Sequence, residues 1–211
     1  MTDLSENLRL LARDALGASK KRRQISAFLK KRGFISLGKG GWLGFRNRDV
    51  VSGLLIEGSP LDTYISTFIL PAFDKREFIT WALGDRVVHC SLNKDTQEEC
   101  EQAVESYVAD ISKVRSSTDL IAYLDARQIK GHYPIWVRYI CHLSLLDFDS
   151  AIQYLNDSRR DQLHHSLMET LEEVERFVTM RDTDGVVRVL ESWRAISERI
   201  FGPLDQMFSA Y

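Results

Sequence analysis

The feature that most constrains the fold is a change in the spacing of hydrophobic residues near Asn93. From Phe34 to Leu92, short runs rich in hydrophobic and β-branched residues are separated by glycines and charged turns, which is typical of β-strands. After Asn93, hydrophobic residues recur every three or four positions as far as Phe201, the spacing of amphipathic helices. A block of strands followed by a block of helices predicts an α+β fold.

The strand block predicts an antiparallel meander of four to five strands. Its turns, such as Asn47 to Asp49 and Gly84-Asp85, are too short for the crossover that parallel neighbours require. The predicted strands cover residues 42–46, 50–57, 63–73, 78–83 and 86–91.

Two short helices are predicted before the sheet and a helical bundle after it. The first two cover residues 3–16 and 20–32, and Gly33 ends the second. Thr96 and Glu99 form a capping-box pattern before a long hydrophobic stripe that starts at Cys100. The remaining predicted helices cover residues 119–128, 134–146, 149–156, 160–181 and 185–201. We expect regions 1–92 and 93–211 to pack as one compact unit.

Charge is distributed unevenly along the chain. Residues 1–50 contain 12 Lys or Arg and 4 Asp or Glu, whereas the remaining 161 residues contain 16 Lys or Arg and 26 Asp or Glu. The overall net charge of −2 is therefore the sum of a basic region and an acidic region. Such asymmetry indicates a charged partner. The predicted binding patch lies in the second helix and first hairpin and comprises Lys20, Lys21, Arg22, Arg23, Lys30, Lys31, Arg32, Lys39, Arg46 and Arg48.

The basic patch has several interpretations. Clustered cations bind nucleic-acid phosphates, so a nucleic-acid-binding module is one hypothesis. A solvated face, or a complement to the acidic helices of the same chain, is the alternative. Membrane-surface binding is not favoured, because the narrow apolar face of the second helix is needed to pack on the sheet.

Other sequence signals give a cytoplasmic prediction without metal or cofactor. Residues 1–18 contain Asp3, Glu6 and Asp14, which a secretory signal would lack, and the longest charge-free apolar stretch, residues 63–73, is too short to cross a bilayer. Three cysteines without paired spacing argue against a disulfide framework and a four-thiolate zinc site.

One short motif suggests catalysis. Arg160 and His165 are separated by four residues, with Asp161 directly after the arginine, and this resembles the R-x4-6-H signature of HEPN ribonucleases. The resemblance implies metal-independent RNA cleavage, with His165 as acid and base and Arg160 stabilising the phosphorane charge. The alternative is a capped helix start with surface histidines.

A second resemblance covers about the first 75 residues. A helix, the pair Gly33-Phe34, a hairpin with Trp42 and then strands at residues 50–59 and 64–73 are similar to small bacterial proteins of unknown function. Neighbouring families serve in toxin immunity or defence. Together with the charge split, this favours a non-enzymatic bacterial protein, an immunity or defence component, that binds another protein through charged surfaces. The ribonuclease and the nucleic-acid-binding module are the alternatives.

Overall fold

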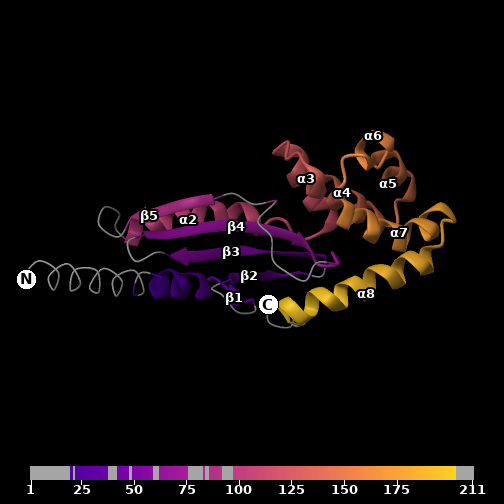
Figure 1. Ribbon diagram of the computed structural model, residues 1–211. Helices are drawn as coiled ribbons and strands as arrows, with labels where there is room; N and C mark the ends of the chain where they lie inside the picture. The colour runs from indigo at the N-terminus through magenta and orange to yellow at the C-terminus, as the bar shows by residue number, and fades with distance from the viewer. Residues whose placement is uncertain are drawn as a thin grey trace, which may run out of the picture. The chain divides into compact units, whose positions relative to one another are not determined.

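The computed structural model confirms the α+β class (Figure 1). It describes residues 20, 22–37, 42–47, 49–58, 62–75, 83, 86–91 and 97–202. The helix predicted at residues 3–16, almost all of the strand predicted at 78–83 and the chain after Gly202 lie outside the described residues.

The described strands form one five-stranded sheet in the order β1-β2-β3-β4-β5, so each of them pairs with the next described strand in the sequence. This confirms the predicted meander, with two corrections: β1 was not predicted, and β4 pairs directly with β5, whereas a strand at residues 78–83 was expected between them. The β1–β2 and β4–β5 pairs are antiparallel, and a register shift lies between Ile65 and Ser66. The strands are β1 Ile35–Ser36, β2 Trp42–Arg46, β3 Val50–Gly58, β4 Asp62–Pro71 and β5 Arg86–Ser91.

The helices follow the sheet, apart from helical residues 20 and 22–30 that precede it. One prediction was wrong: the helix expected over 160–181 is interrupted at residues 161–164. None of the described helices is long and apolar enough to span a membrane. The labelled helices are α2 Gln97–Ile111, α3 Ser117–Ala126, α4 His132–Ser144, α5 Phe148–Tyr154, α6 Asp157–Arg160, α7 His165–Thr179 and α8 Thr183–Phe201.

The chain divides into two compact units. Unit 1 comprises residues 1–45, 52–68 and 84–112, and unit 2 comprises residues 46–51, 69–83 and 113–211. The sequence boundary at residue 92 falls inside unit 1, because α2 contacts β5 and belongs with the strands (Figure 1).

Unit 1 buries the apolar sides of its helices. Ile25 and Leu29 of the first described helix are fully buried, as are Leu54 and Phe68 of the strands. In α2, Val104 is fully buried, and Ser52 Oγ donates a hydrogen bond to the Ile111 carbonyl at 3.4 Å. The narrow apolar face of the first helix is therefore used inside unit 1.

Unit 2 is organised around α4, which contacts α3, α5 and α8. Residues 133–141 are all buried, and the Trp136 ring lies 5.8 Å from the ring of Trp193 in α8. Trp193 is 1% exposed, which confirms its predicted core role. Cys100 of unit 1 and Cys141 of unit 2 are buried and unpaired, and burial raises the pKa of the Cys141 thiol.

Candidate functional site

The predicted basic patch forms, in part, one exposed surface of unit 1. Helical periodicity places Lys20, Arg23 and Lys30 opposite the buried Ile25 and Leu29. Arg22 is half-buried, Arg46 lies in β2, and Lys21, Lys39 and Arg48 lie outside the described residues. We call the exposed cations the basic face: Lys20, Arg23, Lys30, Lys31 and Arg32.

Among the described residues, intramolecular ion pairing involves one member of the basic face, Arg32. Arg32 Nη2 donates to Glu105 Oε1 at 2.7 Å, and its guanidinium lies 3.5 Å from the centre of the Phe28 ring. No described carboxylate pairs with the other four cations of the basic face. All four side chains are exposed.

The side chains of Arg160 and His165 do not face a shared site in the structure. Arg160, at the end of α6, donates both Nη groups to the carboxylate of Glu175, with Nη2 to Oε2 at 3.0 Å. This bond holds the pKa of Glu175 below its ordinary value. Glu175 is ten residues beyond His165, or roughly 15 Å along α7.

His165 instead stands at the start of α7 and is exposed, with its ring 4.0 Å from that of His164. His164 Nδ1 accepts the amide hydrogen of Ser166 and so caps α7. Among the described residues, no three His, Cys, Asp or Glu side chains are grouped to hold a metal ion.

Asp74 is a buried organising residue that the sequence did not single out. It is 4% exposed and accepts hydrogen bonds from Tyr133 Oη at 2.7 Å and Trp136 Nε1 at 3.0 Å. Its carbonyl accepts a bond from Ser197 Oγ at 3.0 Å. Asp74 therefore joins the segment after β4 to α4 and α8 within unit 2.

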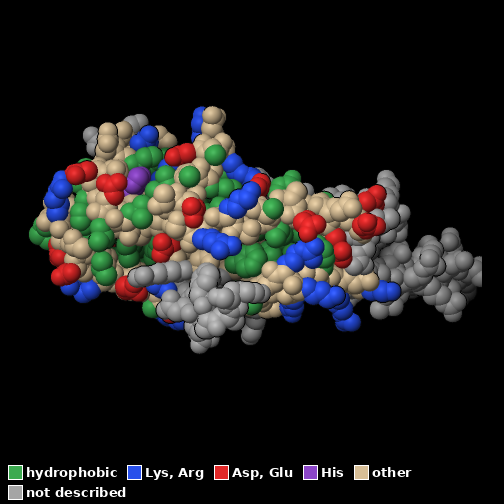
Figure 2. Space-filling model, turned by 180° about the vertical axis from the view of Figure 1, so that it is seen from behind, with side chains coloured by type: hydrophobic (Ala, Val, Ile, Leu, Met, Phe, Trp, Pro, Cys, Tyr) green, Lys and Arg blue, Asp and Glu red, His purple; other side chains and the backbone are tan. Residues whose placement is uncertain are grey.

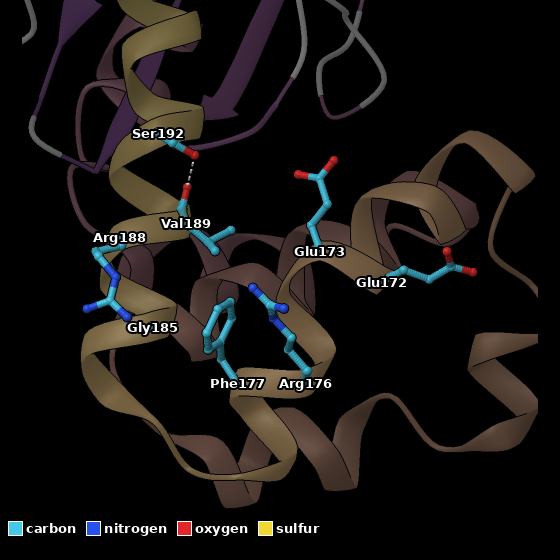
Figure 3. Close-up of a pocket in the computed structure, with 8 residues that line it drawn as sticks. All are labelled: Glu172, Glu173, Arg176, Phe177, Gly185, Arg188, Val189 and Ser192. Carbon is cyan, nitrogen blue, oxygen red and sulfur yellow. Dashed lines mark hydrogen bonds between the residues drawn. The ribbon is translucent and has the colours of Figure 1, made fainter.

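A groove of about 420 Å³ lies between α7 and α8 (Figure 3). Gly185 permits this close approach, since a Cβ there would lie 2.1 Å from Phe177 Cδ1. Glu173 binds Lys75 and accepts from Trp193 Nε1 at 3.1 Å. The lining combines two acidic and two basic side chains and therefore carries no net charge: Glu172, Glu173, Arg176, Phe177, Gly185, Arg188, Val189 and Ser192.

Unit 2 also exposes several large hydrophobic side chains. Figure 2 shows hydrophobic side chains, in green, interspersed with charged ones on one face of the molecule. An ion pair between Arg181 and Asp149 joins the α7–α8 turn to α5. The exposed residues are near the members of this pair in the sequence: at the end of α4, within α5 and directly before Arg181. We define the apolar patch as Leu145, Leu146, Ile152 and Met180, which are 45%, 42%, 49% and 65% exposed.

Leu146 combines exposure with an unfavourable backbone. Its φ is 58°, a left-handed conformation that costs an L-residue roughly 1–2 kcal/mol and usually selects glycine. Its amide donates to the Leu143 carbonyl and that of Asp147 to the His142 carbonyl, both at 3.0 Å, which completes a Schellman helix end. Neither the backbone conformation nor the burial of the side chain favours leucine at position 146.

Comparisons with protein-family models, curated proteins and solved structures gave no match to this chain.

Proposed function

We propose that this chain is a non-enzymatic protein-interaction protein that binds another protein through the apolar patch. The observation that carries the proposal is Leu146, whose large side chain is exposed at a position where the backbone favours glycine. A contact with a partner gives this side chain the burial that its own fold does not provide.

The chemistry of the patch favours a protein as the partner. Aliphatic side chains gain about 25 cal/mol for each Å² removed from water, and a protein surface with its own apolar residues provides that burial. The ion pair of Arg181 and Asp149 adds a polar contact site beside the patch, consistent with interfaces in which an apolar centre has a polar rim.

Leu146→Gly tests this proposal without disrupting the fold. Glycine removes the cost of the left-handed backbone conformation, and this gain offsets the loss of the contacts that the leucine side chain makes. The free energy of unfolding should therefore change by less than about 1 kcal/mol. Purified wild type and variant are compared as baits in a lysate of the source organism. The wild type should retain a protein that Leu146→Gly does not.

Gln128→Gly is the matched control, because Gln128 occupies the same left-handed position at the end of α3, with φ 51°, outside the apolar patch. This control should retain the same protein as the wild type. Equal retention by all three baits, or by none, contradicts the proposal.

The finer part of the proposal is a bacterial immunity or defence role, which rests on the resemblance of the first 75 residues. It predicts that the retained protein is a toxin or nuclease whose activity falls when the wild-type chain is added. A retained protein of any other class excludes the immunity role and leaves the interaction itself standing.

Binding to nucleic acid is a second candidate, and a separate observation favours it. Four cations of the basic face have no described carboxylate partner, and phosphate binding requires only clustered cations. A labelled oligonucleotide titrated at increasing salt tests it, because this affinity falls steeply as salt rises.

A further inference from the structure

A second cavity in unit 2, of about 550 Å³, lies among the end of α3, the start of α4 and the α5–α6 segment. This volume is within the usual range for small-molecule sites, roughly 300–1,000 Å³. The cavity is distinct from the apolar patch and the α7–α8 groove. Its lining comprises Asp125, Gln128, Ile129, Lys130, Gly131, Ile135, Arg138, Tyr154, Asn156, Arg159 and Gln162.

Arg138 is the buried cation of this cavity and is only 8% exposed. Its Nε donates to Asp125 Oδ1 at 2.9 Å, and its Nη1 donates to the carbonyls of Ile129 and Pro134 at 3.3 and 3.5 Å. Nη2 has no hydrogen-bond acceptor among the described residues. A buried guanidinium thus lines the cavity with donor capacity remaining.

Two further cations line the same space. Arg159 is held in place, because its Nη1 donates to the Tyr154 carbonyl at 2.7 Å and its guanidinium lies 4.1 Å from the Tyr154 ring centre. Lys130 is exposed and has no described carboxylate partner. With Asp125 as the one acidic group, the lining has a net charge of +2.

The start of α4 adds to this positive potential. Gly131, its N-cap, lines the cavity and provides no side-chain cap, and the first turn contains no acidic residue. A helix N-terminus carries a partial positive charge, which favours an anion nearby. The amides of Gln128 and Asn156 and the apolar groups of Ile129 and Ile135 complete a mixed lining.

We propose that this cavity binds a small organic phosphate monoester. A phosphate monoester carries about −1.5 to −2 charges at pH 7, which matches the net charge of the lining. Guanidinium groups such as Arg138 and Arg159 bind phosphate oxygens with strong, charge-assisted hydrogen bonds. The volume and the apolar side chains leave room for the organic group.

Phenyl phosphate is a suitable probe, with phenol as the uncharged comparison, and isothermal titration calorimetry measures binding to the full chain. Phenyl phosphate should bind saturably in the sub-millimolar to millimolar range and phenol should not. Affinity should fall between pH 7.5 and pH 5, because the second phosphate ionisation, with a pKa of about 6, is lost.

Lys130→Gln and Arg159→Gln should each weaken binding about tenfold, the loss expected for one charge-assisted hydrogen bond. These variants avoid Arg138, whose removal also disturbs packing. Arg199→Gln, at an exposed cation of α8 outside the cavity, removes the same charge and should leave the affinity unchanged. No saturable binding, equal binding of phenol, or equal affinity in all variants overturns the proposal.

Discussion

Two cations of unit 2 differ from most cations of the basic face in unit 1 in burial and pairing. In unit 2, Arg194 is nearly buried and lies 3.6 Å from Glu198. Arg160 is half-buried against Glu175. In unit 1, four of the five cations on the basic face are exposed without a described carboxylate partner.

This difference shows why the net charge of a region is a poor guide to its binding. Charges paired inside a unit contribute to that unit's fold and offer little to an external ligand. Exposed and unpaired charges contribute little to stability but attract oppositely charged partners over about a Debye length. Buried polar groups in unit 2 should therefore control stability, and the basic face should control the binding of nucleic acid.

Asp74→Ala should have the largest effect, a decrease of about 3 kcal/mol in the free energy of unfolding. The substitution leaves the Tyr133 hydroxyl and the Trp136 indole N–H buried without this acceptor, and an unsatisfied buried donor costs roughly 1–3 kcal/mol. Urea unfolding monitored by tryptophan fluorescence measures the change.

Asp149→Ala is the matched control, since that carboxylate is 78% exposed and pairs with Arg181 at the surface. It should cost less than about 1 kcal/mol. Similar losses of stability for the two variants would contradict the distinction between buried and exposed charges.

The sequence predicted the fold class because hydrophobic spacing is a local signal. Helix boundaries were predicted wrongly where a capping side chain starts a helix at a position that the hydrophobic spacing does not mark. The stripe of residues 160–181 favoured one helix, yet His164 caps a new helix at that point. The capping box formed by Ser116 and Asp119 starts α3 at Ser117, whereas the hydrophobic spacing predicted a start at residue 119.

The candidate sites differ in how far sequence can predict them. The basic face follows from residues close together on one helix, so its pattern was visible. Asp74 lies 59 residues from Tyr133 and 123 residues from Ser197. Such contacts, like the cavity around Arg138, arise only when distant segments pack, and no local pattern predicts them.

Glu175→Gln should have a smaller, pH-dependent effect. Arg160 lowers the pKa of Glu175 in the folded state, so the pair stabilises the fold above the ordinary glutamate pKa. That contribution is lost as the pH falls through the lowered value. The glutamate is 37% exposed, so solvent screening limits the effect at pH 7 to about 1 kcal/mol or less.

Urea unfolding of the wild type and Glu175→Gln at a series of pH values from neutral to acidic tests this expectation. The difference between the two proteins should shrink toward zero at the acidic end. A difference that persists unchanged there would show that the glutamine acts through packing and not through the missing charge.

The double variant Lys30→Gln with Lys31→Gln should have the smallest effect on stability, below about 0.5 kcal/mol, because both side chains are exposed. Its effect on binding distinguishes the two proposed functions. If the basic face binds nucleic acid, the slope of log affinity against log salt should become shallower by about 0.9 for each phosphate that the variant no longer neutralises.

The matched control replaces Arg188 and Arg199, two exposed cations of α8, with glutamine and so removes the same charge from unit 2. An equal decrease of oligonucleotide affinity in both double variants would show that only net charge matters. A decrease confined to the basic-face variant assigns nucleic-acid binding to unit 1. If neither variant changes the affinity, the basic face is a solvated surface and protein binding through the apolar patch is the remaining proposal.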